Sequence, residues 1–142
     1  MKIRKTTKKD IKEIVKIFIK EYSKQPYNEN WTIVQATKRI NAYFKNDNIF
    51  VLEINKQIEG FIIIGFYYWH VGLRGHINEI AVMEEYQGKG YGKMLMKFGE
   101  DYIKSKNAKE ISLLTSTKSL AFKMYKNLSY KEEGYVTMYK KI

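Results

Sequence analysis

The stretch that decides the fold is "INEIAVMEEYQGKGYGKML", residues 77–95. An apolar run over 76–83 predicts a strand, three alternating glycines follow, and a segment with helical apolar spacing comes next. Glycine disfavours helices, so three glycines clustered at a helix start indicate that the backbone itself has a role there. Unpaired N–H groups at a helix N-terminus favour an anion. The stretch therefore predicts an anion-binding loop between a strand and a helix.

The glycine spacing narrows the type of loop. The ATP-type pattern G-x-x-x-x-G-K-[ST] is absent, and the dinucleotide pattern G-x-G-x-x-G fails because residue 93 is lysine. The spacing that is present is Q-x-x-G-x-G, formed by Gln87, Gly90 and Gly92. On these residues alone, a phosphate-binding loop and a glycine-rich turn before a surface helix both remain open.

Length and composition set the class of protein. The 142 residues, 44% of them hydrophobic and 15% aromatic, predict one globular domain over residues 1–142. No apolar run approaches the roughly 18 residues of a membrane helix, and the N-terminus has no signal-peptide pattern, so we expect no membrane partner and a cytoplasmic location. The absence of cysteine excludes disulfides, thiolate metal sites and a cysteine nucleophile, and we expect no metal site.

The net charge of +11 raises the question of a polyanionic partner. The charge comes from 23 lysines and 3 arginines spread along the whole chain. Because nucleic-acid readers usually depend on arginine, a nucleic-acid partner is not expected, and a lysine-rich composition explains the charge equally well.

The order of predicted elements indicates a mixed sheet. Capping residues Thr7 and Thr32 begin two early helices, each with an inward apolar face. The expected strands are 2–6, 48–54, 58–69, 76–83, 110–115 and one or two within 130–141, with helices from Thr7, 32–46, 90–105 and 119–128 and a loop at 71–75. This order predicts an α/β (α+β) fold. Its central sheet has six or seven strands, mostly antiparallel with one parallel pair, flanked by about four helices.

Residues 76–130 resemble the GNAT superfamily of acetyl-CoA-dependent N-acetyltransferases. The matching parts are the Ile80-Ala81-Val82 strand end, the Gln87–Gly92 loop, and the helix segment from Tyr125 to Tyr130, which follows the pattern Y-x-x-h-G-[FY]. Two departures are visible. Met83 follows the strand where the family often has a nearby proline, and Ser129 stands in place of the glycine before the final aromatic residue.

The resemblance implies acetyl-CoA as co-substrate, with its pyrophosphate on the loop and its pantetheine beside the strand at 76–83. The amides of residues 88–93 would be the phosphate donors. The implied cofactor-binding residues are Ile80, Ala81, Val82, Gln87, Gly88, Lys89, Gly90, Tyr91, Gly92 and Lys93.

The resemblance also implies catalytic roles. Tyr125 would be the acid that protonates the leaving thiolate. The base stays open between His76, Glu79 and solvent. Simple strand alternation places His76, Asn78, Ile80 and Val82 on one face and Glu79 on the other, unless a bulge intervenes.

The acceptor is expected to be a small-molecule amine. The stretch "QPYNENWT" (25–32) is similar to a subset that contains aminoglycoside and other small-amine acetyltransferases. Tyr27, Trp31 and Tyr68 are the predicted substrate-binding residues, and attack would be direct, in a ternary complex. The alternatives are a protein or peptide N-terminal acetyltransferase and a non-catalytic acyl-CoA-binding module. A homodimer is compatible with the sequence.

Overall fold

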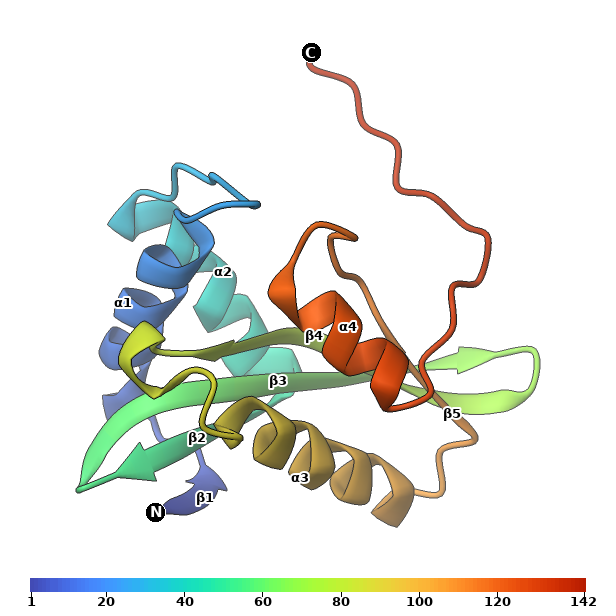
Figure 1. Cartoon of the computed structure of the whole chain (residues 1–142), viewed down its shortest axis with the longest axis horizontal. Helices are drawn as coiled ribbons and strands as arrows, with labels where there is room; N and C mark the ends of the chain where they lie inside the picture. The colour runs from blue at the N-terminus through green and yellow to red at the C-terminus, as the bar shows by residue number, and fades with distance from the viewer.

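A five-stranded sheet in the order β1-β2-β3-β4-β5 forms the centre of the protein, in a computed structural model that describes residues 1–142 (Figure 1). The strands are β1 (Lys2–Lys5), β2 (Asn48–Ile54), β3 (Gln57–Trp69), β4 (Gly72–Val82) and β5 (Glu110–Leu113). Strands β1 to β4 pair antiparallel, and β4 pairs parallel with β5. The predicted mixed sheet with one parallel pair is thus confirmed.

Two helices cover each face of the sheet. Helices α1 (Ile11–Tyr22) and α2 (Ile33–Asn46) pack on one face, and α3 (Tyr91–Ser105) and α4 (Leu120–Asn127) pack on the other. Two short 3-10 turns, Lys8–Asp10 and Glu84–Tyr86, precede α1 and α3. Alternating strand residues feed two cores, one with Val51, Phe61 and Ile63 and the other with Leu52, Ile62 and Ile64.

Local capping sets where the first two helices begin. The Asp10 carboxylate accepts a hydrogen bond from the Thr7 backbone N–H at 2.7 Å, and it also accepts two from the Arg4 guanidinium at 2.8 and 3.0 Å. The Thr32 hydroxyl oxygen accepts a hydrogen bond from the Gln35 N–H at 3.1 Å. Both predicted helix starts are therefore confirmed.

The predicted count of six or seven strands is wrong, because residues 130–141 form no strand. Residues 131–142 are exposed and pair with no strand, so the outer edge of β5 has no neighbouring strand. The expected loop at 71–75 is also largely strand. Trp69 pairs with Gly72 across a tight turn, so β4 starts earlier than its glycines suggested and forms a long hairpin with β3.

A β-bulge in β4 overturns the predicted alternation of side chains. Ile77 pairs with Ile64 and Glu79 with Ile63, which leaves Asn78 as the extra residue. Ile80 and Val82 consequently pack with the α3 and α4 core, together with Ile77. His76 faces the other side of the sheet, and the bulge turns Glu79 to that side, toward α2.

The Asp10 carboxylate gives a testable pH dependence. Hydrogen bonds from Arg4 lower the pKa of Asp10 from 3.8 to about 2. Its contribution to stability is therefore complete above about pH 4 and is lost as the pH falls toward 2. We expect Asp10→Asn to lower the free energy of unfolding by about 1–3 kcal/mol at pH 7, with a smaller difference from wild type near pH 2.5, measured by urea denaturation.

The control is Glu13→Gln, which removes an exposed ion pair with Lys16 (3.7 Å). This change should cost less than about 0.5 kcal/mol. If Asp10→Asn lowered the free energy of unfolding equally at pH 7 and pH 2.5, the stabilisation would not come from the ionised Asp10 carboxylate.

Candidate active site

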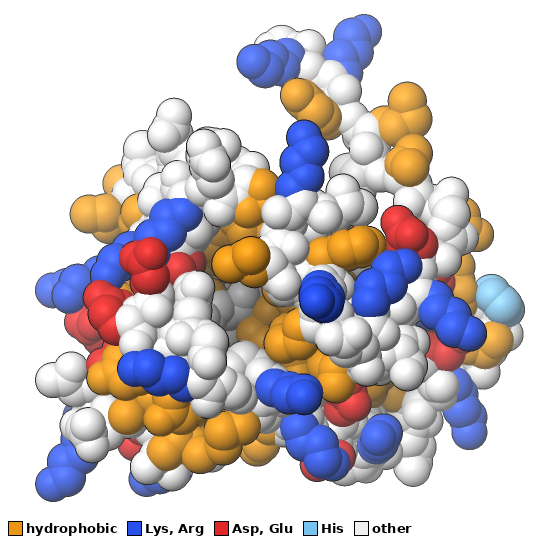
Figure 2. Space-filling model, in the orientation of Figure 1, with side chains coloured by type: hydrophobic (Ala, Val, Ile, Leu, Met, Phe, Trp, Pro, Cys, Tyr) orange, Lys and Arg blue, Asp and Glu red, His pale blue; other side chains and the backbone are white.

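The site lies where β4 and β5 separate. Residues 74–77 of β4 pair with residues 110–113 of β5. Beyond this point β4 continues to Val82 without β5 beside it. The gap opens into a cleft of about 1520 Å³. In the view of Figure 2 the middle of the molecule is hollowed, with apolar side chains inside the hollow and lysine and arginine side chains around it. Residues 78–82 thus have β3 on one side only and face the cleft on the other.

The start of α3 forms one end of the cleft. Gly88 (φ 71°) and Gly90 (φ 88°) adopt the left-handed conformation, and a Cβ on either would meet nothing within 4 Å. None of the backbone N–H groups of residues 88–93 donates a hydrogen bond within the chain. The start of α3 therefore has six unpaired N–H donors, with open space beside Gly88 and Gly90, which suits a phosphate group.

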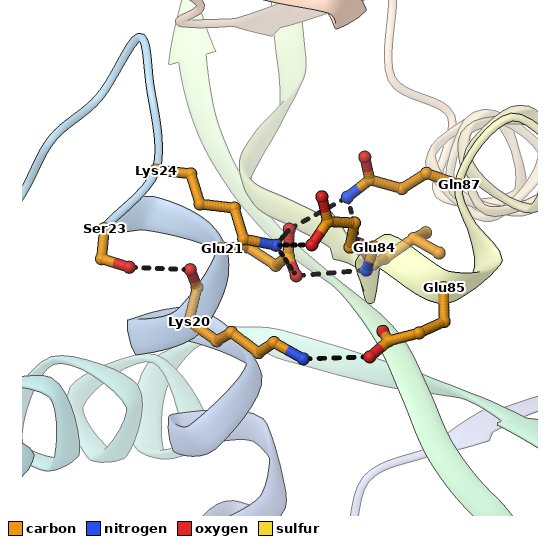
Figure 3. Close-up of polar contacts among 8 residues, drawn as sticks. Lys20, Glu21, Ser23, Lys24, Glu84, Glu85 and Gln87 are labelled. Atoms are coloured by element: carbon orange, nitrogen blue, oxygen red, sulfur yellow. Dashed lines mark hydrogen bonds and ion pairs between the residues drawn. The ribbon is translucent and has the colours of Figure 1, made fainter.

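Gln87 holds this loop in place from within the protein. Its side-chain amide donates to the Val82 carbonyl at 2.7 Å and to the Glu21 carboxylate at 2.9 Å. Glu21 also accepts from the Glu84 backbone N–H at 3.2 Å and from Lys24, so one carboxylate of α1 joins Gln87, the 3-10 turn Glu84–Tyr86 and the loop after α1 (Figure 3). Both amide protons of Gln87 are used in this way.

Ion pairs surround the Glu21 contact. Lys20 of α1 pairs with Glu85 at 3.1 Å, and Lys24 of the loop after α1 pairs with Glu84 at 2.9 Å, so both link this part of the chain to the turn before α3 (Figure 3). Sequence reasoning missed Glu21, because nothing local marks a residue whose partners lie more than sixty positions away.

A helix end sets the position of Tyr125. The Tyr130 N–H donates to the Tyr125 carbonyl and the Ser129 N–H to the Lys126 carbonyl, both at 3.0 Å, which is the Schellman arrangement. The rings of Tyr125 and Tyr130 also touch, with centroids 6.1 Å apart. The pattern from Tyr125 to Tyr130 therefore encodes a helix end that presents Tyr125 to the cleft.

The Tyr125 hydroxyl suits proton donation. The residue is only 6% exposed and lines the cleft, yet its hydroxyl has no hydrogen-bond partner in the protein. Burial raises the pKa of Tyr125 well above its usual value of 10, so the phenol keeps its proton at neutral pH.

Glu79 lies in the same cleft and is held from α2. Its Oε1 accepts hydrogen bonds from Arg39 (2.7 and 3.0 Å) and from the Tyr43 hydroxyl (3.2 Å). Burial raises the pKa of Tyr22, and the neighbouring Glu79 carboxylate raises it further. Arg39 and Tyr43 were not predicted as site residues, since only the bulge at Asn78 turns Glu79 toward them.

His76 lies outside the cleft. It lines a separate small pocket with Tyr67, Asn78 and Asp47, and its Nδ1 is 2.6 Å from the Ser112 hydroxyl. Burial lowers the pKa of His76, and the Arg74 guanidinium lowers it further, so the ring is neutral at pH 7.

Some of the residues predicted to bind the acceptor and the cofactor line the cleft, and others do not. Tyr27 and Trp31 line the cleft, where the Trp31 indole N–H donates to Glu29 at 2.7 Å and Arg39 lies over the Trp31 ring. Tyr68 is 83% exposed near the tip of the β3–β4 hairpin and does not line the cleft. Of the predicted cofactor-binding residues, those that line the cleft are Ile80, Ala81, Val82, Gln87, Gly88, Gly90, Gly92 and Lys93.

The side chains of Lys89 and Tyr91 point elsewhere. The Lys89 ammonium donates to the Glu85 carbonyl at 2.9 Å, and Tyr91 packs against Tyr86. Their backbone N–H groups still belong to the free set at the start of α3.

Comparison with known proteins settles the family. The profile of the acetyltransferase (GNAT) family matches residues 11–130. The chain belongs to this family. It is an acetyltransferase, and an uncharacterised N-acetyltransferase of Archaeoglobus fulgidus is 26% identical to it over 122 residues, which cover 80% of each protein.

Solved structures agree on the fold. A protein of Clostridium difficile 630 described as a possible acetyltransferase superposes with a TM-score of 0.85 at 16% identity, over 99% of this chain and 97% of that one. An aminoglycoside 6′-N-acetyltransferase of Acinetobacter haemolyticus gives a TM-score of 0.78 at 16% identity, over 100% and 99% of the two chains. In this GNAT protein, no helix combines the length and apolar character needed to cross a membrane.

Gly90 tests the phosphate role of the α3 N-terminus. Asparagine and aspartate both tolerate the left-handed conformation better than most residues, so Gly90→Asn and Gly90→Asp should strain the loop about equally. Only aspartate adds a negative charge beside the free amides. We expect Gly90→Asp to bind acetyl-CoA at least about tenfold more weakly than Gly90→Asn, measured by calorimetry. Equal affinities in the two variants would contradict a phosphate site.

Proposed function

We propose that the protein transfers the acetyl group of acetyl-CoA to a primary amine of a small molecule, by direct attack in a ternary complex. One observation carries the proposal. A single cleft joins free backbone amides at the start of α3, the unpaired hydroxyl of Tyr125, and the Glu79 carboxylate among aromatic side chains. These are the groups needed for a phosphate, a leaving thiolate and a cationic amine, respectively.

The cofactor side uses the backbone more than side chains. The amides of residues 88–93 would hold the pyrophosphate, with Lys93 beside them on the wall of the cleft. The residues Ile80 to Val82, whose outer edge faces the cleft, would pair with the pantetheine arm. Gln87 would act by fixing the loop, because its amide protons already bind Val82 and Glu21.

The reacting groups follow from the same geometry. A backbone N–H of the exposed β4 edge would stabilise charge on the thioester carbonyl oxygen. Tyr125 would donate its phenolic proton to the departing sulfur, as its raised pKa keeps that proton in place until it is needed.

Glu79 is our choice for the group that faces the acceptor ammonium. It lies in the cleft, while His76 occupies another pocket. Arg39 and Tyr43 hold its carboxylate in one orientation, and Trp31 and Tyr27 provide aromatic walls nearby. An anionic group among aromatic walls favours a compact cationic amine, which would lose its proton to Glu79 before attack.

A thiol-release assay with acetyl-CoA tests the proposed function. The acceptor panel contains polyamines, aminoglycosides, amino acids and peptides with free N-termini. We expect turnover with at least one small cationic amine and none with peptides. Turnover with peptides alone would favour an N-terminal acetyltransferase, and acetyl-CoA binding without any turnover would favour a binding module.

Tyr125→Phe tests the acid. Loss of one hydroxyl should lower kcat about 10²-fold with the best acceptor and leave the Kd for acetyl-CoA within about threefold of wild type. The matched control is Tyr130→Phe, which removes a hydroxyl that donates to Glu100 at 3.1 Å outside the cleft. That control should cost about 1 kcal/mol of stability without slowing turnover. If the two variants have equal kcat, Tyr125 is not the acid.

Glu79→Gln and His76→Ala test the base. We expect Glu79→Gln to lower kcat/KM at least about tenfold at pH 7, with partial recovery at high pH as free amine accumulates, and His76→Ala to stay within about threefold. Tyr43→Phe is the control for Glu79, because it removes a hydrogen bond to the same oxygen and leaves the charge. If His76→Ala, and not Glu79→Gln, removed the acidic limb of the pH profile of kcat/KM, the base would be His76 and not Glu79.

A further inference from the structure

The ion pair between Arg39 of α2 and Glu79 of β4 lines the acetyl-transfer cleft. The Nε–H and one Nη2–H of the guanidinium bind Glu79 Oε1, at 3.0 and 2.7 Å. An arginine carries five N–H donors. The other three donors of Arg39, including both on Nη1, therefore have no hydrogen-bond partner in the protein, and 44% of the side chain is exposed.

Aromatic rings hold this guanidinium in place. Its central carbon lies 5.4 Å from the centroid of the Trp31 ring and 5.4 Å from that of the Tyr43 ring. Contacts with two rings and a carboxylate fix its orientation before any ligand arrives. A fixed guanidinium with free N–H groups suits a carboxylate, which it can bind through parallel hydrogen bonds.

Glu79 keeps one oxygen free beside this guanidinium. The hydrogen bonds from Arg39 and from the Tyr43 hydroxyl all end on Oε1. Oε2 accepts none within the protein and can face an ammonium. The pair thus offers unused cationic donors next to an unused anionic oxygen. An acceptor that carried only positive charge would leave the Arg39 donors unpaired and would lie close to a like charge.

We propose that the acceptor is an amino acid, whose carboxylate binds Arg39 while the adjacent primary amine faces Glu79. The inference rests on the proposed function and narrows its acceptor. The ammonium loses one proton to Glu79. Attack then forms the C–N bond and breaks the C–S bond, Tyr125 protonates the sulfur, and the surplus amine proton restores the phenol. A peptide N-terminus has an amide in place of this carboxylate, so it would give Arg39 no anion to bind.

Matched acceptors test the role of Arg39. An amino acid is compared with the amine formed by its decarboxylation, such as phenylalanine with phenethylamine or leucine with isopentylamine. The measured quantity is the ratio of kcat/KM for the amino acid to kcat/KM for the amine. We expect a ratio of at least about ten in wild type, and a ratio at least about tenfold lower in Arg39→Gln. Both acceptors use Glu79, so an effect of the variant on the base cancels in the ratio.

Tyr43→Phe is the matched control, because it removes a hydrogen bond to the same Glu79 oxygen while Arg39 keeps its charge. Its ratio should stay within about twofold of wild type. Arg39→Lys is a second variant that keeps a cation beside Glu79 and loses the planar guanidinium, so the ratio should fall at least about threefold.

The outcomes separate this inference from the proposed function. An unchanged ratio in Arg39→Gln and Arg39→Lys would mean that Arg39 only positions Glu79, and would overturn the inference while acetyl transfer stands. Turnover confined to amines without a carboxylate would overturn it in the same way. Absence of turnover with every acceptor of the wider panel would instead contradict the proposed function, and the inference with it.

Discussion

The separation of β4 from β5 is the constraint on which the site depends. Four paired positions hold the strands together, and after Ile77 the bulge at Asn78 twists β4 away while the chain beyond Leu113 turns toward α4. If β4 and β5 had stayed paired up to Val82, β5 would have filled the space of the cleft. Its backbone would also have taken up the hydrogen-bonding groups on the outer edge of residues 78–82. The same bulge turns Glu79 toward α2. One extra residue thus creates the opening and supplies its carboxylate.

Glu21 makes the two halves of the cleft parts of one structure. It belongs to α1, whose following loop carries Tyr27 and Trp31, and it binds Gln87 and the Glu84 N–H at the other end. The Glu21 side chain is 10% exposed, so these hydrogen bonds are stronger than those of a surface contact. The loop after α1 and the glycine loop before α3 are therefore positioned relative to each other by a partly buried carboxylate, while the nearby exposed lysine pairs add little.

Features encoded by neighbouring residues could be predicted from the sequence. The caps at Thr7 and Thr32, the glycine turn before α3 and the helix end after Tyr125 each depend on a few adjacent positions. The bulge could not be predicted, because it depends on the register between β4 and β3.

Long-range partners were inaccessible for the same reason. The hydrogen bonds of Glu21 with Gln87 and of Arg39 with Glu79 join residues far apart in sequence. The prediction of strands at 130–141 was wrong for a different reason. The residues have the composition of strands, but they do not pair with the free edge of β5, and composition alone does not determine strand pairing.

Ser129 shows how firmly the end of α4 is held. It adopts a left-handed conformation (φ 71°), which costs a non-glycine residue roughly 1 kcal/mol. The surrounding contacts offset that cost, because the Tyr130 N–H bonds back to Tyr125, the two rings touch, and the Tyr130 hydroxyl donates to Glu100 of α3. Strain persists where neighbouring contacts determine the geometry in this way. The ring of Tyr125 is thus fixed by the helix end behind it, while its hydroxyl has no hydrogen-bond partner in the protein and is free to bind a group in the cleft.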